Sequence, residues 1–296
     1  MIIFGFFSAL LLFGFLLILI LDVLAMFHIF IPIAFMLFLD LIIVGIGLYF
    51  GTTQPVIKTI NLKANVKKPV TILQLSDLHV GTGFSRHWLE DVVRKANRQE
   101  PDIIVITGDL LDGHVKKLRD KISPLFDLRA RKGVFMVLGN HEYYWGAQEW
   151  KDFFDKSPIT LLLNKSVDLG EIVLGGFPIP LSSRFNREKP DISKTFSQKT
   201  RKPKVLMAHY PVQIESVKNK VFLQLSGHTH GGQIFFPFNL LTRKSSRGYL
   251  KGLYRVGGSW LYVNSGTGLW GGFPIRLGTL PEITIVKILD KNRKMV

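Results

Sequence analysis

The chain has 296 residues, and its 38 lysines and arginines outnumber its 22 aspartates and glutamates, giving a formal net charge of +16 at pH 7. It contains no cysteine, which excludes disulfide bonds and thiolate metal ligands. A charge of this size calls for an anionic partner, such as a membrane surface, a phosphate-bearing substrate or nucleic acid.

The first 50 residues carry only two charges, Asp22 and Asp40, and no lysine or arginine. A transmembrane helix needs about 20 mostly apolar residues, so we expect two helices, at residues 2–21 and 30–50. The segment lacks the basic start and the cleavage site of a signal peptide, and we interpret residues 1–50 as a membrane anchor. Asp40, near the middle of the second helix, is either functional or, as we favour, lies near an interface or pairs within an oligomer.

Basic residues begin directly after this anchor, with Lys58, Lys63, Lys67 and Lys68. By the positive-inside tendency, we expect the N-terminus and the rest of the chain on the cytoplasmic side. Residues 51–68 are expected to form a basic juxtamembrane linker, and residues 69–296 a single domain. Because the chain is tied to a bilayer, the membrane surface explains the positive charge with the fewest assumptions.

Apolar, β-branched runs alternate with helical patterns in the first half of this domain. We expect strands at residues 69–76, 102–107 and 134–138, and helices at 85–99, with Ser85 as N-cap, and 116–131. This order implies parallel strands whose carboxyl ends share one edge of the sheet. Asp77, Asp109 and Asn140 each follow one of these strands and should therefore converge.

The second half is expected to begin with a helix at residues 147–156. Shorter strands are expected at residues 160–163, 167–169, 171–175, 204–208, 222–225, 260–264 and 282–289. The pattern by itself predicts an α/β fold that is largely parallel at its start.

Five of the eight histidines stand in short polar blocks where expected strands run into loops. In chain order the blocks are Ser76-Asp77-Leu78-His79, Gly108-Asp109, Gly139-Asn140-His141-Glu142, Ala208-His209 and Gly227-His228-Thr229-His230. Carboxylate, amide and imidazole ligands suit a pair of divalent ions, and two ions about 3.5–4 Å apart commonly hydrolyse phosphate esters. A single histidine at a strand end is usually an ordinary core or surface residue, but the ordered set predicts a metal-dependent hydrolase.

These blocks resemble those of the calcineurin-like metallophosphoesterases, over roughly residues 70–289. The stretches GNHEYY (139–144) and LSGHTHGGQIFFPFNLL (225–241) are most similar to the membrane-associated bacterial branch. The resemblance implies a four-layer α/β/β/α sandwich of two mixed sheets, preceded by a transmembrane hairpin in the bacterial inner membrane. It also implies a phosphoric ester or pyrophosphate hydrolase with two divalent metal ions, which would be manganese, zinc or iron.

The resemblance further implies a role for each residue of the blocks. One metal would be held by Asp77, His79 and His230, the other by Asn140, His209 and His228, with Asp109 bridging the two. His141 would be the catalytic histidine that is not a ligand, protonating the leaving oxygen or stabilising the phosphoryl charge, and Glu142 would orient it. His209 is followed by Tyr210, where this branch more often has a glutamine-like residue.

A stretch after His230 mixes aromatic and basic side chains, as does a surface that dips into lipid headgroups. The candidate substrate residues in it are Phe235, Phe236, Phe238, Arg243, Lys244 and Arg247. Alternatively, its apolar members pack on the sheet and its basic members are merely solvated.

We expect a phosphorylated, lipid-linked substrate, and on resemblance to membrane-bound members UDP-2,3-diacylglucosamine is the first to try. The alternatives are a general phosphodiesterase or nuclease, or a non-catalytic membrane scaffold that keeps the fold. No dedicated nucleic-acid module is recognisable, and every expected ligand position is filled.

Overall fold

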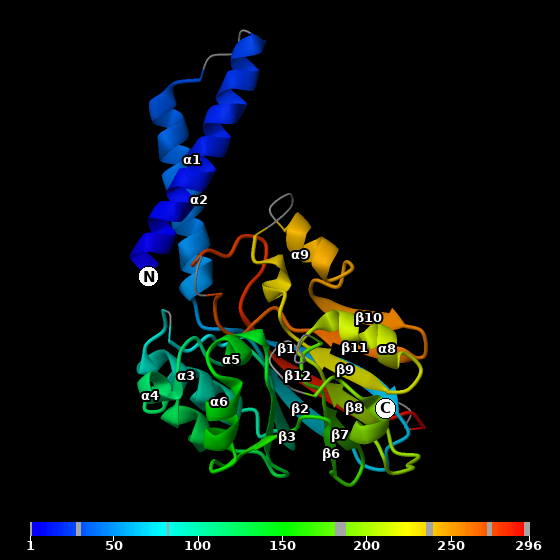
Figure 1. The fold of residues 1–296 in the computed structure, drawn as a ribbon. Coiled ribbons are helices and arrows are strands. Elements are labelled where there is room, and N and C mark those ends of the chain that lie inside the picture. The colour runs from blue at the N-terminus through cyan, green and yellow to red at the C-terminus, as the bar shows by residue number, and fades with distance from the viewer. Residues whose placement is uncertain are drawn as a thin grey trace.

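The computed structural model describes residues 2–27, 31–81, 83–180, 188–234, 239–270 and 274–292, with the side chains of residues 2–5 left out. Two long apolar helices form a hairpin that projects from the rest of the chain (Figure 1). They are α1 (Ile2–Met26) and α2 (Ile33–Thr52), and both are long and apolar enough to cross a membrane. α2 begins later than expected because Pro32 takes the N-cap position, where its fixed φ and missing N–H are tolerated.

The first sheet has six strands in the order β1-β12-β2-β3-β4-β5. Their bounds are β1 Val56–Ala64, β2 Val70–Leu75, β3 Ile103–Thr107, β4 Val134–Val137, β5 Ile159–Leu161 and β12 Glu282–Asp290. β2 to β5 pair in parallel, as the alternation of strands and helices predicted, whereas β12 runs antiparallel to β2 and parallel to β1. The carboxyl ends of β2, β3 and β4 therefore share one edge.

The expectation of a linker at residues 51–68 is corrected here, because half of this range, Val56–Ala64, forms β1 at the edge of this sheet. Leu62 and Ala64 are buried on the sheet, while Lys58 and Lys63 are exposed. Exposed lysines are a common protection of an edge strand, so these basic residues belong to the folded domain and not to a separate linker. Only residues 53–55 separate α2 from β1.

The second sheet also has six strands, in the order β10-β11-β9-β8-β7-β6. Their bounds are β6 Lys165–Asp168, β7 Val173–Gly176, β8 Lys204–Met207, β9 Leu223–Ser226, β10 Gly252–Val256 and β11 Ser259–Val263. The shorter helices are α3 Arg86–Asn97, α4 Val115–Leu118, η1 Ser123–Asp127, α5 Asn140–Tyr144, α6 Ala147–Phe154, α7 Ile192–Thr195, η3 Pro211–Gln213, α8 Ile214–Val217, η4 His230–Gly232 and α9 Leu240–Ser245. β10 was not expected, since it lies within the aromatic and basic stretch.

Three cores hold these layers together. One lies between the first sheet and the helices outside it, another between the two sheets, and a third outside the second sheet. Two mixed sheets packed face to face with helices outside them confirm the predicted fold class. The single helix expected at residues 116–131 is wrong: it divides into α4 and η1, because Pro124 lacks the N–H that a helix interior requires.

Candidate metal centre

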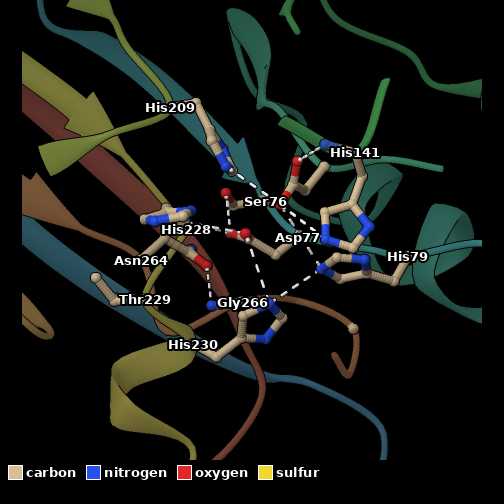
Figure 2. Close-up of polar contacts among 12 residues, drawn as sticks. Ser76, Asp77, His79, His141, His209, His228, Thr229, His230, Asn264 and Gly266 are labelled. Atoms are coloured by element: carbon tan, nitrogen blue, oxygen red, sulfur yellow. Dashed lines mark hydrogen bonds and ion pairs between the residues drawn. The ribbon is translucent and has the colours of Figure 1, made fainter. Parts of the chain in front are cut away.

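The polar blocks meet where strands of both sheets end. Asp77 and His79 follow β2, Asp109 follows β3, and Asn140 opens α5 directly after β4. From the second sheet, His209 follows β8, and His228 and His230 follow β9. In Figure 2 the imidazoles of these blocks surround the side chain of Asp77. The convergence expected from the strand order is therefore present.

One group of possible ligands consists of Asp77, His79 and His230, whose donor atoms lie within 4.8 Å of one another. The Nε2 atoms of His79 and His230 are 3.0 Å apart, and Nε2 of His230 is 3.7 Å from Oδ1 of Asp77. All three side chains are buried. Lone pairs that face one another at this spacing can be shared by one cation.

A second group consists of Asp109, His209 and His228, again within 4.8 Å. Nε2 of His209 lies 3.2 Å from Oδ2 of Asp109 and 3.1 Å from Oδ1 of Asn140. Oδ2 of Asp109 is also 4.0 Å from Nε2 of His79 in the first group. The Asp109 carboxylate therefore lies between the two groups, where a bridging ligand has to be.

Hydrogen bonds behind the cavity orient the imidazole rings. Nδ1 of His79 lies 3.1 Å from both carboxylate oxygens of Asp112, and Nδ1 of His209 lies 2.8 Å from the carbonyl oxygen of Thr107. A proton on each Nδ1 satisfies these acceptors and directs Nε2 at the cavity. Burial opposes protonation of His209, but the charge of Asp109 outweighs it and raises the pKa of His209 to about 9, so a bound cation would replace the proton on its Nε2. Oxygen and backbone acceptors of this kind commonly support metal-bound histidines.

Asp112, which was not among the predicted site residues, contacts both His79 and His141. One of its carboxylate oxygens forms a very short hydrogen bond with Nδ1 of His141. Glu142, which was expected to orient His141, is buried and instead accepts hydrogen bonds from the backbone N–H groups of Asp109, Leu111 and Gly139. The only signal for Asp112 was a second acid three residues after Asp109, in the loop that follows β3.

Charges around the cavity shift the pKa values of the histidines in opposite directions. Burial opposes protonation of His141, but the hydrogen bond with Asp112 and the charge of Asp109 outweigh it and raise its pKa to about 9. Burial and the nearby His209 lower the pKa of His228 to about 3, and burial and His79 also lower the pKa of His230. His228 and His230 are therefore neutral, the form that binds metal, whereas His141 is suited to carry a proton.

The backbone at the site is strained. Five residues of the polar blocks have a left-handed φ: Asp77 (51°), His79 (48°), Asp109 (48°), His228 (74°) and His230 (50°). Each such residue costs on the order of 1–3 kcal/mol and persists only where its surroundings hold it. Neighbouring glycines allow this packing, because a Cβ on Gly227 would lie 2.1 Å from Oδ2 of Asp77. Burial, strain and the mixed oxygen and nitrogen donors together fit the binding of divalent metal.

A cavity of about 830 Å³ opens beside the two groups, and we call it the site cavity. Its lining residues form two sets. Those in or beside the metal groups, which we call the metal-binding wall, are Asp109, Asn140, His141, His228 and His230, and the others, which we call the second wall, include Ile234, Leu241, Lys244 and Trp270. Of the expected substrate residues, Lys244 lines the cavity, whereas Arg243 and Arg247 are not among its described lining residues. Phe235, Phe236 and Phe238 lie outside the described residues.

Comparisons with known proteins identify the family of this architecture. A family model described as calcineurin-like phosphoesterase matches residues 70–232. A metallophosphoesterase of Helicobacter pylori is 38% identical over 252 residues, which cover 83% of this chain and 67% of that protein. A bovine protein described as a transmembrane protein with metallophosphoesterase domain is 31% identical over 261 residues, covering 81% of this chain and 58% of its own length.

Among solved structures, a dimetal phosphatase from Danio rerio aligns with a TM-score of 0.44 and 13% identity, over 68% of this chain and 88% of that chain. A 5'-nucleotidase from Staphylococcus aureus, described as putative, aligns with a TM-score of 0.45 and 12% identity, over 77% and 56% of the two chains.

Proposed function

Because the chain belongs to the calcineurin-like metallophosphoesterases, a family of metal-dependent phosphoester hydrolases, we propose that it cleaves a phosphodiester or pyrophosphate bond in a lipid-linked substrate. The observation that carries this proposal is the site cavity, whose one wall holds the possible metal ligands and whose other wall is partly apolar. A phosphate group can then be held at the first wall while an apolar tail contacts the second.

Two divalent ions, of manganese, zinc or iron, would lower the pKa of a bound water and neutralise developing phosphoryl charge. Asp77, His79 and His230 are proposed to hold one ion, and Asn140, His209 and His228 the other, with Asp109 between them. His141 is proposed to donate a proton to the leaving oxygen, and Asp112 to keep it protonated and oriented. These assignments combine the distances around Asp109 with the neutral state of His228 and His230.

The lipid-linked substrate is supported by contact between the site cavity and the helical hairpin. Ile234 lines the cavity and also packs in an apolar cluster with Ala9, Phe13 and Val44 of α1 and α2. Leu241 also lines the cavity and is 83% exposed, so its side chain is available to contact an apolar tail. UDP-2,3-diacylglucosamine, in which a pyrophosphate joins a lipid and a nucleotide, is the first substrate to test.

A location on the cytoplasmic face of a bacterial inner membrane follows from the same proposal. Both helices of the hairpin are uncharged at their domain-side ends, while exposed Lys58 and Lys63 follow directly. In Figure 1 the N-terminus and the domain lie at the same end of the hairpin. A multi-pass arrangement with both on the basic side agrees with the positive-inside tendency.

The test uses the full chain, purified in detergent or lipid nanodiscs and supplied with manganese, zinc or iron. Hydrolysis is measured against nucleotide-linked lipids, phospholipids, bis-p-nitrophenyl phosphate and single-stranded DNA. We expect the lipid-linked substrates to have the highest kcat/KM. A higher kcat/KM for DNA or for the water-soluble diester would overturn the proposal.

A pair of leucine variants examines the apolar wall directly. Leu241→Asn should lower kcat/KM for the lipid-linked substrate and leave the water-soluble diester unchanged, since Leu241 lines the cavity but is not one of the possible metal ligands. Leu253→Asn, at another exposed leucine, on β10, that is not in the described cavity lining, should change neither. Equal loss for both substrates in Leu241→Asn would contradict a lipid-contacting role.

A further inference from the structure

Residues 274–277, the docking segment, lie between the helical hairpin and the metal groups. We propose that Arg276 in this segment is a positioning residue for the metal group of Asp77, His79 and His230, and that contact with α2 holds Arg276 in place. The hairpin then supports metal binding as well as anchoring the chain. This inference rests on the proposed function only in taking that group as a metal site.

Arg276 is fully buried, which is rare for an arginine and costly unless its donors are satisfied. Its guanidinium donates to the carbonyl oxygens of Gly268 (2.6 Å), Ser265 (2.8 Å), His230 (3.3 Å) and Gly266 (3.4 Å). Nη2 also lies 3.4 Å from Nδ1 of His230. Its described hydrogen bonds therefore go mainly to the main chain, so the side chain acts as a cross-link between backbone segments.

The carbonyl acceptors of Arg276 belong to two segments that carry the metal group. One segment contains His230 itself. The other, residues 265–268, pairs with the backbone around Asp77: the N–H of Gly268 donates to the Asp77 carbonyl (3.0 Å), and the N–H of Thr267 donates to the Ser76 carbonyl (2.6 Å). Arg276 therefore fixes the backbone of His230 relative to that of Asp77. Without it, several buried carbonyls would lose their donor and the two ligands could move apart.

The backbone of Arg276 is in turn held by α2. Its N–H donates to the carbonyl oxygen of Gly47 at 2.9 Å. Ile275 and Leu277, on either side of Arg276, are buried in one cluster with Ala9, Phe13 and Val44 of the hairpin. The docking segment thus uses its alternate residues to bind the hairpin and its central arginine to reach the metal group.

Two glycines of α2 make this approach possible. A Cβ on Gly47 would lie 2.3 Å from Cγ2 of Ile275, and a Cβ on Gly51 would lie 2.4 Å from the carbonyl oxygen of Pro274. Both distances are far inside van der Waals contact, so even alanine would push the docking segment away. Gly45, in the same helix, has open space at its Cβ position, with nothing within 4 Å. It offers a matched control.

The experiment compares the double variant Gly47→Ala/Gly51→Ala with Gly45→Ala and wild type, all as full chains in detergent. Each glycine-to-alanine substitution adds one methyl group and raises helix propensity, but only the substitutions at Gly47 and Gly51 displace the docking segment. Manganese or zinc bound per chain is measured by elemental analysis after dialysis against a series of buffered free-metal concentrations. We expect the double variant to bind one ion about 10- to 100-fold more weakly, as is typical when outer support of metal ligands is lost, and Gly45→Ala to match wild type.

Arg276→Lys is the second variant, because lysine keeps the charge but lacks the planar fork that reaches several carbonyls. We expect the same weakening of one ion and a smaller rise in Tm on adding metal. If circular dichroism shows that Arg276→Lys is not folded, the result for Gly47→Ala/Gly51→Ala alone tests the inference. Wild-type metal affinity in a folded Gly47→Ala/Gly51→Ala protein would overturn the inference.

The outcome is separable from that of the proposed function because no ester is present in the metal measurement. A chain that binds metal with the expected dependence on Gly47 and Gly51, yet hydrolyses no phosphoester, would refute the proposed activity and support the role of Arg276. If the chain hydrolyses lipid-linked esters but binds metal equally well in wild type and in both variants, the proposed activity is supported and the role of Arg276 is refuted.

Discussion

The two walls of the site cavity are built in different ways. The metal-binding wall consists of buried and half-buried side chains at strand ends, and Asp109, His228 and His230 in it have a left-handed conformation. The second wall includes residues of α9, none of which is buried, and Trp270, which is 49% exposed. Groups that perform chemistry need fixed positions, whereas a wall that receives an apolar tail tolerates looser packing. Changes to the first wall should therefore affect every substrate, and changes to the second only some.

The largest effect is expected for Asp109→Asn, at the centre of the first wall. A neutral amide cannot balance two cations, so metal and activity should be lost together, by more than the ~10- to 100-fold typical of outer hydrogen-bond partners. Elemental analysis and hydrolysis of a soluble diester measure both. Asp120→Asn, whose side chain is 88% exposed, is the matched control. If wild type binds well under two ions per chain under metal-replete conditions, the two-ion assignment fails.

His141→Ala should retain its metal but slow turnover by about 10²- to 10⁴-fold, because it removes a proton donor rather than a ligand. The loss should shrink for substrates with good leaving groups such as nitrophenolate. His87→Ala, at an exposed histidine on α3, should have no effect. Equal losses with good and poor leaving groups would indicate that His141 stabilises phosphoryl charge instead.

Asp112→Asn should reduce activity by about 10- to 100-fold, since it weakens the support of both His79 and His141. The carboxylate of Asp112 helps to raise the pKa of His141 to about 9, so its loss lowers that pKa. A general acid acts below its pKa, and the alkaline limb of the pH–activity profile should move to lower pH. An unchanged alkaline limb would show that Asp112 does not control the pKa of His141. In the double variant Asp112→Asn/His141→Ala, any loss of activity beyond that of His141→Ala alone measures the effect of Asp112 through His79.

The most selective effect is expected for the charge beside the second wall, tested by changing to glutamine the three basic residues Arg243, Lys244 and Arg247. Basic residues near an anionic bilayer contribute about 1 kcal/mol each, so turnover of a lipid-linked substrate should fall in anionic nanodiscs and much less in neutral ones. Hydrolysis of a soluble diester should not change. The control removes the same charge from exposed residues elsewhere, namely Lys199, Arg201 and Lys220. If hydrolysis of the lipid-linked substrate and of the soluble diester fall equally, these basic residues support the fold and do not contact the lipid surface.

Sequence periodicity predicted the strands that place the first wall. β2, β3 and β4 are short apolar runs, and a polar residue directly after each must lie at the shared edge of a parallel sheet. That is why Asp77, Asp109 and Asn140 could be placed together from the sequence. The positions of His209, His228 and His230 depended on family resemblance, because short strands in a mixed sheet give no comparable rule.

What could not be predicted depended on side-chain direction and on distant contacts. Glu142 and Asp112 are both acids near His141 in the sequence, but the turn into α5 directs Glu142 to backbone N–H groups and leaves Asp112 facing the histidines. Arg276 lies 46 residues after His230 in the chain, and no local pattern indicates that it is buried beside it. β1 was missed because its pairing partner, β12, lies at the other end of the chain.

The short connection between α2 and β1 limits how far the domain can travel. Residues 53–55 span at most about 11 Å when fully extended, so the sheet edge cannot leave the end of the helix. In a bilayer, the site cavity would be kept at nearly constant height above the headgroups, and its search would be confined to two dimensions. Such an enzyme would sense the surface density of its substrate in the membrane and would be insensitive to the volume of the compartment around it.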